Sequence, residues 1–154
     1  MATLRDEIRQ TRAFDGPEQE AHLGIERTAA VLGHALAEVL KPFGITATQY
    51  NVLRILRGAG KAGLCRSGVR ERLVAQVPDV TRILDRMEEG GLVERERDAA
   101  DRRFVTTRVT PAGLALLARL DAPMAEAHRR LLGHLGEEKL RTLVELLAQA
   151  RQGA

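Results

Sequence analysis

The stretch PDVTRILDRMEEGGLVERERDAADRRFVTTRVT, residues Pro78–Thr110, decides the fold. It begins as a short amphipathic helix whose apolar side chains recur at helical spacing and form one inward stripe: Val80, Ile83, Leu84 and Met87. Gly90 and Gly91 then supply the left-handed cap that a turn into a strand requires. Two strand-like runs follow, at Leu92–Arg97 and Phe104–Thr110, joined by a six-residue tip. The stretch therefore predicts a helix followed by a β-hairpin.

Three helices are expected before this stretch. A long one is predicted over residues 17–41, because Pro17 suits a first helical turn and Pro42 stops the apolar pattern. The next opens with the capping box Thr46-x-x-Gln49, in which each side chain satisfies a free backbone N–H of the first turn. A short third helix is indicated from Ser67 to Val74, and residues 1–15 are interpreted as a partly ordered arm.

Leucine-rich helices follow the stretch. Thr110 caps and Pro111 opens one of them, in which Pro123 removes a helix hydrogen bond and is a candidate kink. A last helix is expected over residues 137–151, after Gly136. Three helices followed by a hairpin form the winged helix-turn-helix plan. We therefore expect a mainly α fold with a small β-hairpin wing.

Composition limits the classes of function. With 154 residues, 44% hydrophobic and 29% charged, the chain fits an ordinary soluble domain. No apolar run approaches eighteen residues and no signal peptide is apparent, so the expected location is cytoplasmic and not in a membrane. The sequence has no phosphate loop, nucleophile elbow or catalytic carboxylate pair, and its histidines lack metal-site spacing. An enzyme, a cofactor and a bound metal are therefore not expected.

Positive charge is concentrated in the middle of the chain. Residues 46–110 hold 13 Arg and Lys against 9 Asp and Glu, whereas the remainder holds 11 against 12. A basic middle region indicates a polyanionic partner. The outer face of the decisive helix is short and polar, and it suits base edges in the major groove of duplex DNA through Asp79, Thr81, Arg82 and Arg86.

The hairpin tip adds two arginines, Arg102 and Arg103, which are predicted to enter the minor groove, whose negative potential attracts guanidinium groups. Asp98 or Asp101 beside them is predicted to orient an arginine through a carboxylate pair. Arg66 and Ser67 are also included among the predicted DNA contacts. Two plainer interpretations stay open: the tip arginines solubilise a turn, and Arg82 and Arg86 pair with Asp79, Asp85 or Glu89 on an ordinary surface helix.

At these residues the sequence resembles the MarR family, the multiple antibiotic resistance regulators of transcription. The resemblance spans residues 20–150 and consists of five motifs in order: Thr46-x-x-Gln49-Tyr50-x-Val52-Leu53, Thr81-Arg82-x-Leu84-Asp85-Arg86, Gly91-Leu92-Val93-Glu94-Arg95, Asp98-x-x-Asp101-Arg102-Arg103 and Thr110-Pro111-x-Gly113. It implies a homodimer that binds a pseudo-palindromic operator, represses nearby genes and releases DNA when a small-molecule effector binds. It also implies a DNA-binding lobe at 46–110 and dimerisation helices at 17–42 and 111–152. Tyr50 is a candidate effector contact, with core packing as the alternative.

Cys65 departs from the family pattern, because a Thr or Ser cap is usual at the start of the third helix. It is interpreted as a small half-buried side chain, and a thiol-based redox switch is kept as an alternative. Another alternative is a protein-protein interaction module whose winged helix no longer binds DNA.

Overall fold

The computed structural model describes residues 2–97 and 104–153 of the chain. These residues form the following helices and strands, in chain order: α1 (Leu4–Glu7), α2 (Pro17–Leu40), η1 (Lys41–Phe43), α3 (Ala47–Ala59), η2 (Gly60–Ala62), β1 (Leu64–Cys65), α4 (Arg66–Arg72), α5 (Val80–Glu89), β2 (Val93–Arg97), β3 (Val105–Val109), α6 (Pro111–Leu132), η3 (Gly133–Leu135) and α7 (Gly136–Gln152). The mainly helical fold with a small sheet confirms the predicted fold class.

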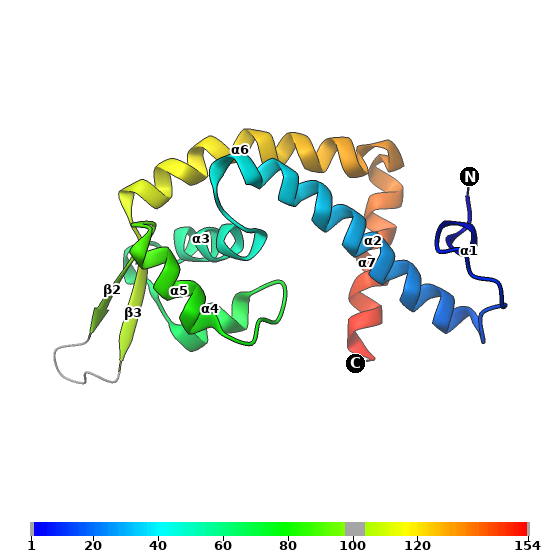
Figure 1. Ribbon diagram of the computed structural model, residues 1–154, viewed down its shortest axis with the longest axis horizontal. Helices are drawn as coiled ribbons and strands as arrows, with labels where there is room; N and C mark the ends of the chain where they lie inside the picture. Colours follow the sequence, from blue (N-terminus) through cyan, green and yellow to red (C-terminus); the bar gives the residue numbers. More distant parts are fainter. Residues whose placement is uncertain (1, 98–103, 154) are drawn as a thin grey trace.

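The helices and the sheet form an arch (Figure 1). Helices α3, α4 and α5 and the strands make a lobe at one end, α6 runs along the top, and α7 descends at the other end. Helix α2 lies against α6 and carries the N-terminal arm at its far end. Two long helices therefore connect a small lobe to a distant α-helical region.

The lobe has a continuous apolar core. It is built from the inward faces of α3, α5 and α6, with one valine from α4 and one from β2, and its fully buried side chains include Val52, Leu53, Leu56, Val69, Leu84, Met87, Val93, Leu117 and Leu120. The stripe expected for α5 is buried at Val80, Leu84 and Met87, and Ile83 packs partly buried against the same core. Burial of this stripe fixes which face of α5 is presented to solvent.

The capping interactions follow the sequence rules. Thr46 and Gln49 form the predicted capping box of α3, with Gln49 Oε1 accepting from the Thr46 N–H at 2.9 Å. At the start of α6, Thr110 Oγ1 accepts from the Gly113 N–H at 3.1 Å and donates to the Gly91 carbonyl at 2.6 Å. A Cβ on Gly113 would lie 2.4 Å from the Leu92 carbonyl oxygen, so this close approach requires glycine.

The sheet has three strands in the order β1-β3-β2, all antiparallel. The predicted hairpin is present, with Val93 opposite Val109 and Arg97 opposite Val105. The strand β1 was not predicted, and it pairs Leu64 with Thr107. A two-residue strand is too short to produce a periodic pattern, so its partner is found only in three dimensions.

Several predicted boundaries need correction. The third helix is Arg66–Arg72 rather than 67–74, because Leu73 is extended and the Val74 N–H donates to the Asn51 side chain at 2.9 Å. The arm contains one helical turn, α1, closed by a capping box between Thr3 and Asp6. Helix α6 continues through Pro123 without a break.

Candidate nucleic-acid interface

Helix α5 presents the side chains that the sequence predicted as a DNA-reading face. Asp79 is its N-cap, and Asp79 Oδ1 accepts from the Arg82 N–H at 2.9 Å. Arg82 and Arg86 are exposed on the side opposite the buried stripe, and Thr81 is half-buried between them and α4. The helix start is therefore stabilised by Asp79, while a base contact by the same carboxylate stays a prediction.

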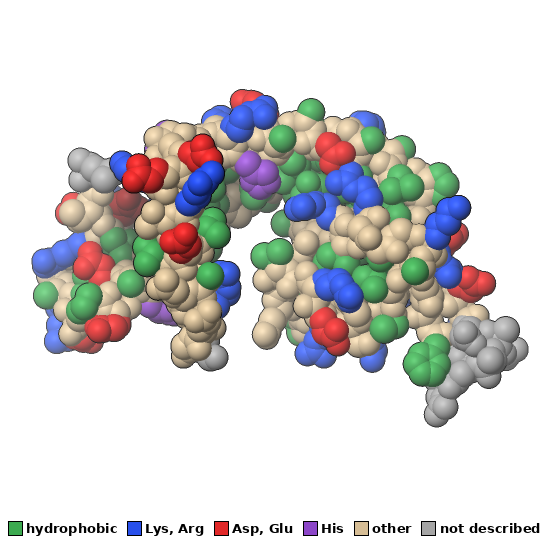
Figure 2. All heavy atoms as spheres, turned by 180° about the vertical axis from the view of Figure 1, so that it is seen from behind, with side chains coloured by type: hydrophobic (Ala, Val, Ile, Leu, Met, Phe, Trp, Pro, Cys, Tyr) green, Lys and Arg blue, Asp and Glu red, His purple; other side chains and the backbone are tan. Residues whose placement is uncertain are grey.

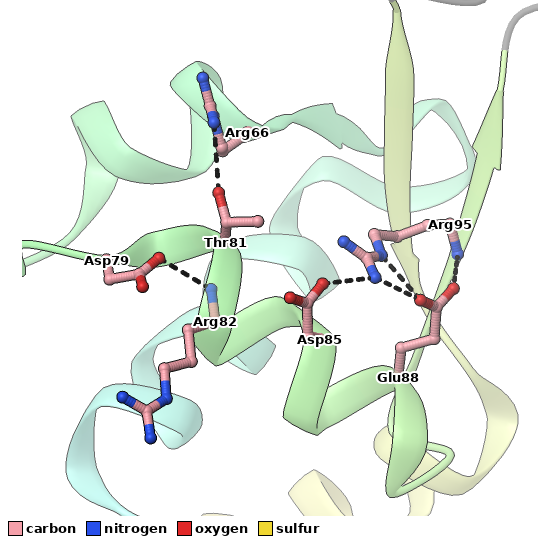
Figure 3. Close-up of polar contacts among 7 residues, drawn as sticks. All are labelled: Arg66, Asp79, Thr81, Arg82, Asp85, Glu88 and Arg95. Carbon is pink, nitrogen blue, oxygen red and sulfur yellow. Dashed lines mark hydrogen bonds and ion pairs between the residues drawn. The ribbon is translucent and has the colours of Figure 1, made fainter.

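Thr81 is linked to the start of α4. Arg66 Nη1 lies 3.2 Å from Thr81 Oγ1, and both residues are drawn in Figure 3. A guanidinium group only donates hydrogen bonds, so Thr81 Oγ1 accepts here and its own proton remains available to an outside acceptor. The structure thus brings Arg66 and Thr81 together, with exposed Ser67 beside Arg66 in the first turn of α4.

Cys65 is exposed, so the interpretation of a half-buried side chain was wrong. Its Sγ lies 3.1 Å from Ser67 Oγ at the start of α4. The Ser67 hydroxyl and the backbone amides of this first turn lower the pKa of the Cys65 thiol. The cap position that the family usually gives to Thr or Ser is therefore held by an accessible thiol with raised acidity.

The arginines on the outer face of α5 are available to a partner. Among the residues that the structure describes, neither Arg82 nor Arg86 forms an ion pair, and Figure 3 shows the Arg82 guanidinium directed away from Asp79 and Asp85. Asp85 instead lies 2.7 Å from Arg95 Nη2. The alternative in which Asp79, Asp85 or Glu89 pairs with these arginines is therefore not seen among the described residues.

Arg95 is a residue of this region that sequence reasoning missed. It lies on β2 and also binds Glu88 of α5, with Nε 2.8 Å from Glu88 Oε2. The carboxylates of Glu88 and Asp85 raise the pKa of the Arg95 guanidinium. The sequence gives little indication of this role, because a helix residue and a strand residue that pair across a Gly-Gly turn have no fixed spacing in sequence.

The predicted wing contacts, Asp101, Arg102 and Arg103, lie outside the described residues, as does Asp98. The strands that lead to them are described, and β2 ends at Arg97 while β3 begins at Val105. These residues thus stay predictions from the sequence.

A cavity of about 430 Å³ lies between α4, α5 and the sheet. It is lined by both polar and apolar side chains, which include Arg66, Thr81, Leu84, Arg95 and Phe104. The Arg66 guanidinium beside apolar side chains suits a small anion with an apolar part, whereas Arg95 is already paired with Asp85 and Glu88. The cavity thus adjoins the predicted DNA-contacting residues directly.

Tyr50 lies in α3, away from that cavity, and packs half-buried against the core. The Arg54 guanidinium lies over its ring, 5.9 Å from the centroid. The alternative of core packing is thus seen, and an effector contact by Tyr50 stays a prediction.

The described part of the chain holds neither a metal site nor a membrane span. Within residues 2–97 and 104–153, no three His, Cys, Asp or Glu side chains gather as a metal site. In the same part of the chain, no helix has both the length and the hydropathy for a membrane span.

The lobe, with its exposed α5 face and two-stranded wing, defines a winged helix-turn-helix protein. The model of the MarR family matches residues 43–103. The multiple antibiotic resistance protein MarR of Salmonella typhimurium is 35% identical over 115 residues, which cover 73% of this chain and 77% of MarR. The chain therefore belongs to the MarR family and is a transcription regulator rather than an enzyme.

Two more relatives are similar over most of the chain. The homoprotocatechuate degradative operon repressor of Escherichia coli is 31% identical over 111 residues, covering 72% of this chain and 74% of the repressor. The crystal structure of a mutant E. coli MarR complexed with operator DNA has a TM-score of 0.78 at 27% identity and covers 97% of this chain and 99% of that one. The likeness thus extends from the lobe to the outer helices.

Proposed function

We propose that the protein is a homodimeric repressor that binds a pseudo-palindromic operator in duplex DNA and is released by a small molecule. The observation that carries the proposal is the outer face of α5, where Arg82 and Arg86 are exposed and form no ion pair with another described residue. Arginine binds guanine O6 and N7 in the major groove with two hydrogen bonds, which reads sequence directly. The operator complex of the related E. coli MarR and the related operon repressor support the same assignment.

In this proposal α5 enters the major groove with its first turns against the bases. Asp79, Arg82 and Arg86 bind base edges, and Thr81 donates its hydroxyl proton to a base or a phosphate. Arg66 and Ser67 at the start of α4 bind the phosphate backbone, which fixes register and contributes salt-dependent affinity. Arg102 and Arg103 are proposed to enter the minor groove, and Asp101 to orient one of them, on the sequence argument alone.

Dimerisation is supported by the lack of burial in the outer helices. Across its 24 residues α2 buries Leu40 alone, and no residue of α7, which is described in full, is buried. Apolar side chains are exposed on both helices, among them Ile25 and Val31 on α2 and Val144 and Leu146 on α7. Figure 2 shows hydrophobic side chains gathered on the hollowed inner side of the arch.

A second copy of the chain would cover this surface, since burying one such side chain contributes about 1.5–3 kcal/mol. We therefore assign residues 46–110 to the DNA-binding lobe and residues 17–42 and 111–152 to dimerisation. A two-fold dimer then places its α5 helices about 34–36 Å apart, one turn of B-DNA. The two helices, related by two-fold symmetry, would then read two half-sites of opposite orientation, so the operator is expected to be pseudo-palindromic.

Release by a small molecule is supported by the cavity between α4, α5 and the sheet. An anion bound there would contact Arg66 and Thr81, which are also proposed DNA contacts. Binding of the effector and binding of DNA would therefore compete for the same groups. Benzoate, an aromatic carboxylate, is a suitable first probe for release of DNA. The Tyr50→Phe variant tests the alternative, in which the effector contacts Tyr50.

The competing function is a protein-protein interaction module whose lobe no longer binds DNA. A selection from a random pool of duplexes separates the two functions. The proposal expects an enriched pseudo-palindrome, bound by two chains per duplex and at least about a hundredfold more tightly than a scrambled duplex. Absence of any enriched sequence, with the folded protein present, would favour the interaction module.

A further inference from the structure

A cluster of three charged side chains joins α5 to β2, and none of the proposed DNA contacts uses it. The Arg95 guanidinium donates to Glu88 Oε2 from Nε at 2.8 Å and from Nη2 at 2.5 Å. Nη2 also lies 2.7 Å from Asp85 Oδ1. The Arg95 backbone N–H donates to Glu88 Oε1 at 3.1 Å. One arginine therefore holds two carboxylates and anchors its own strand to the helix (Figure 3).

The cluster is poorly suited to bind phosphate. Two carboxylates face one guanidinium, so the group as a whole is negative and repels a polyanion. The Arg95 side chain is also only 24% exposed. Its direct partners are thus on the protein, and its effect on a DNA complex must pass through them.

Arg95 is expected to affect DNA binding through Asp85. It follows Arg82 by three residues on one helix, and side chains at this spacing are neighbours that pair readily when their charges are opposite. While Arg95 binds the Asp85 carboxylate, Arg82 forms no ion pair within the described part of the chain. Without Arg95, Asp85 would be free to bind Arg82 and neutralise its charge.

We propose that Arg95 is a positioning residue for DNA recognition, which sequesters Asp85 from the base-reading Arg82 and, through Glu88, ties the wing strand to α5. This inference rests on the proposed function, because it assigns Arg95 a part in the binding of the operator. It differs from a phosphate contact in two measurable ways: the dependence of affinity on salt, and rescue by a second substitution.

The test uses the full-length dimer and the duplex selected by the wild-type protein. Arg95→Met is expected to weaken binding about tenfold or more, because it leaves the Asp85 carboxylate unpaired beside Arg82. Adding Asp85→Asn to the same chain removes that carboxylate and is expected to restore affinity to within about threefold of the wild type. Arg12 is an exposed arginine of the N-terminal arm, and Arg12→Met is the control for the loss of one positive charge.

The salt dependence separates positioning from contact. The slope of log affinity against log salt should stay the same in Arg95→Met, because no phosphate contact is lost. A slope smaller by about 0.9 identifies a phosphate contact and overturns the inference. Failure of Asp85→Asn to restore binding overturns it as well.

Asp85→Asn alone provides a variant in which Glu88 still holds Arg95. This variant is expected to bind at least as tightly as the wild type, because it has lost a carboxylate from the helix that is presented to DNA. A clear loss of affinity would overturn the inference. This test holds even if the Arg95→Met protein does not fold. If the wild type binds no duplex, the proposed function fails and the inference with it. If the wild type binds and the rescue fails, only the inference is lost.

Discussion

Arg57 Nη1 lies 3.0 Å from Oδ1 and 2.9 Å from Oδ2 of Asp121, so an ion pair connects α3 of the lobe to α6. The Asp121 carboxylate raises the pKa of the Arg57 guanidinium. The two side chains are 64 residues apart in sequence and remain partly exposed, at 38% and 51%. Because the pair lies where the lobe meets the outer helices, its removal tests whether it fixes the orientation of the lobe relative to α6.

Asp121→Asn should have a small effect on stability and a larger one on binding. Solvent screens this exposed pair, so the free energy of unfolding should fall by less than about 1 kcal/mol. Operator affinity should fall about threefold to tenfold, because the two lobes of a dimer must be held at a fixed separation. Glu126→Gln is the control, since it breaks a pair with Arg129 inside α6. Equal losses of affinity in both variants, measured by fluorescence anisotropy, would contradict this.

The close approach at the start of α6 predicts a loss of stability in Gly113→Ala. The added Cβ would meet the Leu92 carbonyl and a Val109 methyl group at 2.4 and 2.7 Å, so backbone must shift. We expect the free energy of unfolding to fall by about 1–3 kcal/mol. In Gly58→Ala the Cβ points into open space on α3, and this control should gain about 0.5–1 kcal/mol. Urea unfolding measures both, and a loss in the control equal to that in Gly113→Ala would refute the steric account.

Cys65 predicts a pH dependence of thiol reactivity. Because the Ser67 hydroxyl lowers the pKa of the thiol, the reactive thiolate forms at lower pH in the folded chain than in the unfolded one. Iodoacetamide should therefore alkylate the native protein at pH values where the urea-unfolded protein reacts slowly. The associated stability is present above the unfolded pKa and is lost as pH falls through the folded one. Coincident native and unfolded rate profiles would show that Ser67 has no such effect.

The operator should protect the same thiol, since Cys65 directly precedes two proposed phosphate contacts. Cys65→Ser should keep its affinity for the operator, because serine is among the preferred N-cap residues of a helix. If oxidant releases DNA from the wild type but not from Cys65→Ser, the thiol-based alternative is correct; equal release from both discards it.

Val144→Asp should prevent dimerisation. Val144 is 66% exposed in α7, and an aspartate there places a charge in the proposed contact between subunits. The variant should elute as a folded monomer in light-scattering chromatography, with unchanged helical circular dichroism, and should lose operator binding. Val74→Asp, at a valine that is 91% exposed in the lobe, should remain a dimer. A dimeric Val144→Asp protein would move the contact surface away from α7.

Local rules predicted the parts of the fold that depend on neighbours in sequence. The α3 capping box, the buried stripe of α5 and the Thr110 cap of α6 each follow from residues within a few positions. The strand β1 could not be predicted, because Leu64 acquires its strand geometry from Thr107, far along the chain.

The same distinction applies to the candidate site. The residue types on α5 could be predicted from helical spacing, since burial of one face determines the other. The contacts that orient them could not, because Arg66 meets Thr81, and Arg95 meets Asp85, only once α4, α5 and the sheet have packed. Cys65 was misjudged for a related reason, since a residue at a helix start can face either the core or solvent.

The central claim is that the outer face of α5 reads DNA sequence, and Arg82→Ala tests it most directly. Anisotropy titrations of the folded dimer should show operator affinity reduced by about 1–3 kcal/mol, with a much smaller loss on a scrambled duplex. The same change at Arg12 should leave the ratio of the two affinities unchanged. An Arg82→Ala protein that binds operator and scrambled duplex as the wild type does would contradict the account.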